Sequence, residues 1–126
     1  MSYKTNYSRV HGLGSAHSGA HHFWVQRVTA IALIPLTILF VFPFADALGS
    51  SYEAVRATYQ NSWNAIIAIS FLIVGFWHLN LGLQVIIDDY VHSKPVRLTL
   101  TLANVILNGV FAVAGVFAVA KIAFSA

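Results

Sequence analysis

Three long segments of this chain contain no Lys, Arg, Asp or Glu, and they constrain the fold more than any other feature. They run from Val28 to Ala45, from Ala65 to Ile87 and from Leu98 to Ala120, which makes them 18, 23 and 23 residues long. A helix rises about 1.5 Å per residue, and about 20 apolar residues are needed to cross the hydrocarbon core of a bilayer. Each segment therefore predicts a transmembrane helix.

The composition supports a membrane protein. Of the 126 residues, 58% are hydrophobic and only 9% are charged, whereas soluble domains average about 25% charged residues. We therefore expect an all-α fold, a bundle of three transmembrane helices. It would form one membrane domain over residues 1–126, with a polar N-terminal segment at 1–22 and helices at about 23–46, 63–89 and 96–122.

Cysteine content and charge exclude several classes of function. The chain has no cysteine, which excludes disulfides, cysteine-ligated iron–sulfur clusters and thioether-linked haem within it. The net charge of +3 rests on very few residues, so no nucleic-acid-binding surface is expected. Arg27 and the Ala45-Asp46-Ala47 sequence flank the first apolar segment as in a secretory signal. That segment exceeds the usual 7 to 15 residues, so we expect an uncleaved helix.

Positive charges predict the orientation in the membrane, because Lys and Arg accumulate in cytoplasmic loops. With the N-terminus inside and the C-terminus outside, the cytoplasmic side carries five of these residues and the other side two. The five are Lys4, Arg9, Arg27, Lys94 and Arg97, and the two are Arg56 and Lys121.

Two pairs of amides interrupt the apolar segments. Asn80 and Gln84 share one face of the second segment, and Asn104 and Asn108 share one face of the third. Amides at such positions usually form hydrogen bonds to other helices, and this packing role is the interpretation that the residues favour. Because the second segment is polar on two sides, the pattern also predicts helices on both sides of it, and so a partner subunit.

His78 is the one ionisable residue of the second segment, and in lipid an imidazole needs a partner. Gly75 and Gly82 fall on the same helical face, so the flanking turns lack side chains. One interpretation is an axial ligand to haem, with the flat macrocycle lying against the helix. The other is a hydrogen bond to a neighbouring helix, with the glycines marking close packing. Other histidines lie near or outside the boundaries, so a second haem ligand would come from another chain.

The cytoplasmic end of the second segment carries Asp89 and Tyr90. A phenol beside a carboxylate, with Arg27 on the same side of the membrane, is suited to bind a quinone head group. An interfacial tyrosine anchor with a paired carboxylate has the same pattern, and the residues alone favour that interpretation. His21 and Arg27 are both placed to approach an anionic group such as a propionate or a lipid phosphate. The run of His11, His17, His21 and His22 lacks the spacing of a specific metal site.

Two motifs resemble a known family. Residues 19–30 match the pattern G-x-H-x-F-x3-R-x-T-A, and His78 with Asp89-Tyr90 matches H-x10-D-Y. Together they are similar to the hydrophobic membrane anchor of succinate dehydrogenase, the small cytochrome b anchor of respiratory complex II. The similarity covers the first two segments. The chain departs from the pattern at His22, where some members have an acid, and at the additional acid Asp88.

The resemblance implies a set of partners and site residues. His78 would supply one axial ligand to a b-type haem iron, a companion cytochrome b anchor subunit the other, and His21 and Arg27 would lie near the propionates. Tyr90 and Asp89 would hydrogen-bond ubiquinone. The chain itself would be non-catalytic, a multi-pass protein of the inner (cytoplasmic) membrane. It would hold a flavoprotein and an iron–sulfur subunit that serve succinate oxidation in the tricarboxylic acid cycle. The alternatives are an anchor of the fumarate-reductase type and a purely structural subunit without haem.

Overall fold

The computed structural model describes residues 16–125, and these residues form four helices joined by short turns. The helices are α2 (Ala16–Ala47), α3 (Tyr52–Gln60), α4 (Ser62–Tyr90) and α5 (Lys94–Ala123). Lys4, Arg9 and His11, on which some of the predictions above rest, lie outside the described residues. The predicted all-α fold is confirmed.

Three of the four helices are long and apolar enough to cross a membrane. The spans are Gly19–Ala47, Ser62–Tyr90 and Lys94–Ala123, of 29, 29 and 30 residues. These confirm the three transmembrane helices expected from the charge-free segments. The first helix already begins at Ala16, within the segment expected to be polar, and it continues through Gly19 into the apolar stretch.

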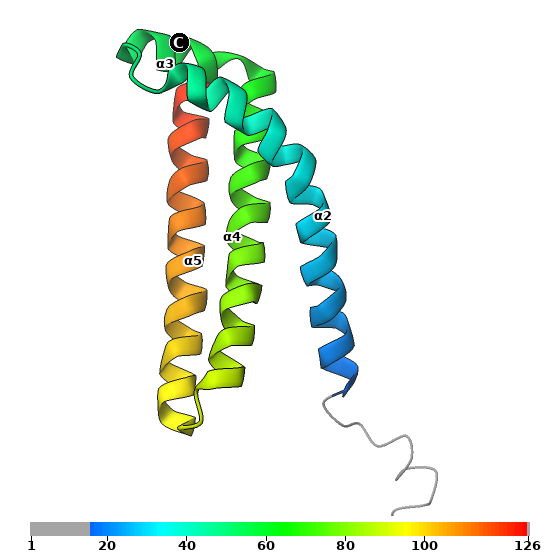
Figure 1. Cartoon of the computed structure of the whole chain (residues 1–126). Helices are drawn as coiled ribbons and strands as arrows, with labels where there is room; N and C mark the ends of the chain where they lie inside the picture. The colour runs from blue at the N-terminus through cyan, green and yellow to red at the C-terminus, as the bar shows by residue number, and fades with distance from the viewer. Residues whose placement is uncertain (1–15, 126) are drawn as a thin grey trace, which may run out of the picture.

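α4 is the central helix of the bundle. It packs against α2 on one side and against α5 on the other, while the backbones of α2 and α5 do not approach each other closely within the described residues (Figure 1). α4 and α5 run antiparallel and side by side. α2 leans away from α4 toward its own N-terminus, so the two helices diverge at the end of the bundle where Tyr90 lies (Figure 1).

α2 continues as a helix through both Pro35 and Pro43, although proline removes one backbone hydrogen bond from a helix. The chain leaves α2 through Gly49, whose φ of 75° is the left-handed conformation that glycine adopts readily. The side chain of Ser51 then caps α3 by accepting a hydrogen bond from the Ala54 amide at 3.3 Å. These local features reverse the chain at the membrane surface.

The connection between α2 and α4 contains a helix that was not predicted. α3 is a nine-residue amphipathic helix that lies across the end of the bundle (Figure 1). It is attached at its C-terminal end, where Gln60 Nε2 donates a 2.8 Å hydrogen bond to the Ser125 carbonyl. Tyr59 is the buried residue of α3, and burial raises the pKa of its phenol above the ordinary value of 10.0.

α3 covers an apolar hollow of about 330 Å³ at this end of the molecule. All four helices contribute to its lining, so it lies where they converge. The lining residues are Phe40, Phe44, Ala47, Leu48, Val55, Tyr59, Ala68, Leu72, Ala118, Val119 and Ile122.

Amide side chains join α4 to α5, in agreement with the packing role predicted for them. Asn104 Nδ2 donates a 2.9 Å hydrogen bond to the Asn80 carbonyl, and Gln84 Nε2 donates one of 3.1 Å to Thr101 Oγ1. Asn108 Nδ2 in turn donates to Asn104 Oδ1 at 2.8 Å. Helices of the same chain therefore flank α4 on both sides, so Gln84, Asn104 and Asn108 do not require the partner subunit that was inferred from the amides. The buried Oδ1 atom of Asn80 has no hydrogen-bond partner among the described residues.

Most apolar side chains of the spans remain exposed. The buried residues are few and small, such as Ala65 and Ala68 of α4, whereas Ile31, Val113 and Phe117 are about two-thirds exposed (67%, 70% and 67%). Apolar surface of this extent is stable only against lipid or against other apolar protein surfaces. The isolated bundle therefore presents its outer faces to the bilayer or to other subunits.

Candidate functional site

His78 lies on the face of α4 that packs against α2. Its Nδ1 atom is 2.9 Å from the hydroxyl oxygen of Thr29, which is 5% exposed. The same hydroxyl lies 2.8 Å from the Val25 carbonyl oxygen and 3.0 Å from the Gln26 carbonyl oxygen, in the preceding turn of α2. One buried hydroxyl therefore links the backbone of α2 to the imidazole of α4.

The other ring nitrogen of His78, Nε2, has no hydrogen-bond partner among residues 16–125. His78 is half-buried and lies well inside its span. A polar nitrogen at this depth has no water to bond, so it needs a partner from outside the described chain. Within the same residues, no group of three His, Cys, Asp or Glu side chains is placed to hold a metal ion. Any metal bound at Nε2 would therefore need further ligands from elsewhere.

The glycines beside His78 do not form the open strip that was considered as a surface for a macrocycle. A Cβ atom on Gly75 would lie 3.9 Å from Leu33 Cδ2, and one on Gly82 would lie 3.5 Å from Gln26 Nε2. Leu33 and Gln26 both belong to α2. The glycine face is therefore covered by α2, and the close-packing interpretation holds for these two residues.

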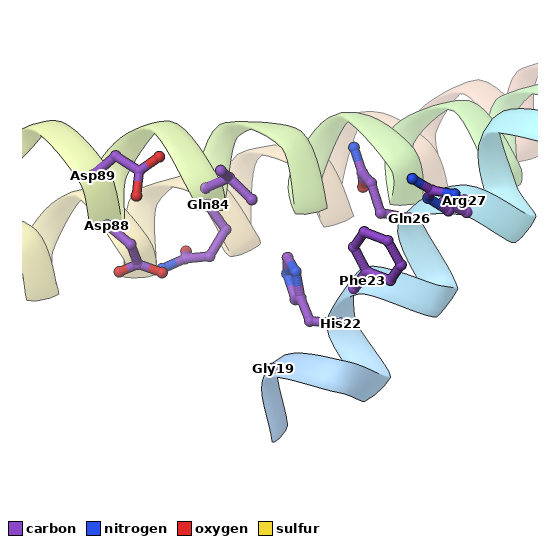
Figure 2. Close-up of a pocket in the computed structure, with 9 residues that line it drawn as sticks. Gly19, His22, Phe23, Gln26, Arg27, Gln84, Asp88 and Asp89 are labelled. Carbon is purple, nitrogen blue, oxygen red and sulfur yellow. The ribbon is translucent and has the colours of Figure 1, made fainter. Parts of the chain in front are cut away.

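A cleft of about 570 Å³ opens where α2 and α4 diverge, on the same side of the bundle as Tyr90. His22 projects from α2 into the space between the helices, and Gln84 and Asp88 face it from α4 (Figure 2). The residues that line the cleft are Gly19, His22, Phe23, Gln26, Arg27, Gln84, Val85, Asp88 and Asp89.

Some polar atoms in the wall of this cleft have hydrogen-bond partners within the chain, and others do not. Gln84 Nε2 donates to Asp88 Oδ2 at 3.1 Å as well as to Thr101. The buried Oε1 atom of Gln26 has no hydrogen-bond partner in the described part of the chain. A buried acceptor of this kind calls for a donor, so the cleft is suited to hold water or a polar ligand group.

The structure brings some of the predicted site residues together and separates others. Arg27 and Asp89 both line the cleft, and the Arg27 guanidinium lies 4.4 Å above the centre of the Phe23 ring. His21 is exposed on α2 and does not line the cleft, whereas the neighbouring His22 does. Tyr90 is 78% exposed at the end of α4 and also lies outside the lining.

No role in the site was predicted for Thr29, Gln26 or His22 from the sequence, although all three belong to it. Gln26 and Thr29 are polar residues three positions apart in the helix, so they share a face. This polar face could have been detected from the sequence. Its contact with α4 could not, because the rotation of α2 about its axis depends on how the two helices pack.

Comparison with known proteins identifies the family of this chain. The family described as the succinate dehydrogenase/fumarate reductase transmembrane subunit matches residues 1–117. The chain belongs to this family. No solved structure matches it significantly.

Several relatives in this transmembrane family are named as anchors. The chain is 36% identical over 126 residues to the succinate dehydrogenase hydrophobic membrane anchor subunit of Paracoccus denitrificans, covering 100% of this chain and 97% of that one. It is 32% identical over 90 residues to the subunit of the same name in Rickettsia bellii, covering 71% and 72%. The succinate dehydrogenase membrane anchor subunit of Reclinomonas americana is 32% identical over 84 residues, covering 64% and 70%.

The family and the three apolar spans together make the chain a multi-pass membrane protein and a succinate dehydrogenase membrane anchor subunit. A membrane-anchor subunit belongs to a complex with other subunits. The exposed apolar faces of the spans provide surface for such contacts.

Proposed function

We propose that this anchor subunit binds one b-type haem together with a companion anchor and helps to form the ubiquinone site of a succinate:ubiquinone oxidoreductase. The observation that carries the proposal is the environment of His78. One ring nitrogen is held by Thr29 inside the bundle, and the other has no partner in the described chain. A haem iron is a partner that fits such a nitrogen at this depth.

His78 Nε2 would hold the haem iron from one side. The other described histidines, at positions 17, 21, 22 and 92, lie near the ends of the spans or outside them, so the second axial ligand would come from the companion cytochrome b anchor. Arg27, at the mouth of the cleft, and the exposed His21 would provide positive or hydrogen-bonding groups for the propionates. When bound, the haem would accept and release single electrons, and this chain would supply its ligand and its apolar surroundings.

Asp89 and Tyr90 would contribute to the ubiquinone site. The Tyr90 phenol is exposed at the end of α4, where its O–H can donate to a quinone carbonyl oxygen. Asp89 faces the cleft between α2 and α4, from which water can exchange protons with it. Because Tyr90 does not line this cleft, the remaining walls of the quinone pocket would belong to other subunits.

The chain would hold the flavoprotein and iron–sulfur subunits on the cytoplasmic side of the inner membrane and would carry no catalytic residue of succinate oxidation itself. Arg27, Lys94 and Arg97 lie on the side that the positive-inside rule assigns to the cytoplasm. Tyr90, Asp89 and the cleft lie on that same side. The quinone site would therefore face the subunits that deliver electrons.

Purification of the complex through a tag on this chain tests the proposal. We expect the companion anchor, the iron–sulfur subunit, the flavoprotein and haem to co-purify with it. Recovery of a complete complex without haem would contradict haem binding. Recovery of this chain without the two catalytic subunits, under conditions that preserve succinate-dependent quinone reduction in membranes, would contradict the anchoring role.

A further inference from the structure

We infer that Thr29 is a positioning residue for His78: its hydroxyl holds the imidazole as the tautomer with the proton on Nδ1, which leaves the Nε2 lone pair free for iron. The inference rests on the proposed haem-binding function and deepens it. It assigns to a residue of α2 the control of a ligand on α4.

The tautomer follows from the hydrogen atoms available to the Thr29 oxygen. Three groups lie within hydrogen-bond distance of it: the Val25 carbonyl at 2.8 Å, the Gln26 carbonyl at 3.0 Å and His78 Nδ1 at 2.9 Å. A hydroxyl has one hydrogen to donate and two lone pairs that accept. Carbonyl oxygens only accept, so the hydroxyl hydrogen points to them. The Thr29 oxygen then accepts from an N–H at Nδ1.

The opposite tautomer would leave donors and acceptors mismatched. The hydroxyl hydrogen would have to turn from the two carbonyls to Nδ1, and the proton at Nε2 would find no acceptor among the described residues. An N–H without an acceptor in an apolar span carries the full desolvation penalty of that group. A metal at Nε2 excludes that proton altogether. Iron binding and the Thr29 contact therefore favour the same tautomer.

The packing of α2 on α4 brings the hydroxyl to this position. Thr29 is buried, and the two carbonyl groups that accept from its hydroxyl belong to its own helix. Contacts within α2 therefore orient the hydroxyl independently of His78. Gly75 and Gly82 lie one turn to either side of His78. Leu33 and Gln26 of α2 lie only 3.9 and 3.5 Å from the Cβ positions that the glycines leave vacant. A side chain larger than alanine at either glycine would push α2 away and lengthen the Thr29–His78 contact.

The contact also has an electronic consequence. An imidazole that donates from Nδ1 to an acceptor becomes a more basic ligand through Nε2. A more basic ligand stabilises oxidised iron relative to reduced iron, so the Thr29 oxygen lowers the reduction potential of the haem. Loss of such a contact to a metal-ligating histidine typically weakens metal binding by about 10- to 100-fold.

The test compares Thr29→Val, which keeps the shape but removes the oxygen, with Thr29→Ser, which keeps the hydroxyl, in the assembled complex. At one fixed applied potential, we expect the ratio of reduced to oxidised haem to rise about tenfold in Thr29→Val, which corresponds to about 59 mV for one electron. Thr29→Ser should match the wild type. An unchanged ratio in Thr29→Val, with haem retained, would overturn the inference and leave the proposed function standing.

A second measurement reports the tautomer of His78 directly. ¹⁵N NMR of the His78 ring in the wild-type complex, with the haem reduced and diamagnetic, should show a protonated Nδ1 and a hydrogen-bonded signal that weakens in Thr29→Val. If the wild-type complex contained no haem, the proposed function would fail, but the same spectrum would still report the tautomer. A proton found on Nε2 would overturn the role of Thr29 in either case.

Discussion

Asn104 on α5 donates a 2.9 Å hydrogen bond to the backbone carbonyl of Asn80 on α4, within the most extensive helix–helix contact of the bundle. Both the donor and the adjacent Asn108 are more than nine-tenths buried, at 7% and 8% exposure. Lipid does not drive apolar helices together, so a hydrogen bond of this kind helps to select the partner face. The two asparagines thus specify how α5 lies on α4.

Replacement of Asn104 by leucine should weaken the α4–α5 contact. Interhelical hydrogen bonds in membranes contribute about 0.6 kcal/mol on average and up to about 1.7 kcal/mol. We therefore expect the substitution to lower the free energy of unfolding by an amount in that range. Unfolding of the purified chain in mixed detergent micelles measures it. Val105→Leu, at a neighbouring position that is 52% exposed, is the matched control. Equal stability of Asn104→Leu and the wild type would show that the amide does not hold the helices together.

Two glycines of α5 should respond differently to alanine. A Cβ on Gly115 would lie 3.1 Å from Leu72 Cδ1, whereas one on Gly109 would meet nothing within 4 Å. Alanine gains about 1 kcal/mol over glycine in a helix interior. We expect Gly109→Ala to stabilise the chain by up to this amount and Gly115→Ala to gain less, because Leu72 must move. The same detergent unfolding assay compares them, and a larger gain at Gly115 would contradict the packing described.

Tyr59 should make the docking of α3 sensitive to alkaline pH. Burial raises the pKa of its phenol in the folded protein above 10.0. The unfolded chain then loses this proton at a lower pH than the folded chain. The contribution of the buried, protonated Tyr59 phenol to stability is therefore complete below pH 10 and is lost as the pH rises through the folded-state pKa.

A phenylalanine at this position should remove that part of the pH dependence. Thermal unfolding measured from pH 8 to 11 should show a smaller loss of stability for Tyr59→Phe than for the wild type. Tyr52→Phe is the control, since Tyr52 is 72% exposed on the same helix. If Tyr59→Phe and the wild type lost stability in parallel, burial of the phenol would not be the cause.

Tyr90→Phe should slow quinone reduction by the complex, because it removes the phenolic donor that we assign to a quinone carbonyl oxygen. A positioned hydrogen-bond donor of this kind typically contributes about 10²-fold or more to a rate. Succinate oxidation with an artificial dye should be unchanged, since this route avoids the quinone site. Quinone reduction at the wild-type rate would remove Tyr90 from the mechanism. Tyr52→Phe, on the opposite side of the membrane, should affect neither assay.

The spans were predictable because twenty or so uncharged residues have few alternatives to a transmembrane helix. α3 was missed because it has only nine residues, in a connection rich in turn-forming residues. Its capping residue Ser51 and the four-residue spacing of its inward-facing Val55 and Tyr59 were the available signals. Short amphipathic helices of this kind depend on the surface that they cover, and the sequence does not display that surface.

The site was predictable only in part. Helical periodicity correctly placed Gly75, His78 and Gly82 on one face, since this requires only the geometry of one helix. It did not reveal that α2 covers that face, or that Thr29 meets the imidazole. Such contacts depend on the rotation and tilt of two helices, which small differences in packing decide. The family motif includes Thr29 but says nothing of its contact with His78.

The most direct test of the account is the reduced-minus-oxidised absorption spectrum of the purified complex, recorded for the wild type, His78→Ala and His92→Ala. His92 is exposed in the loop between α4 and α5 and serves as the control. We predict a b-type α-band in the wild type and in His92→Ala, and its loss or shift in His78→Ala with all subunits still present. An unaltered band in the assembled His78→Ala complex would contradict ligation of the haem iron by His78.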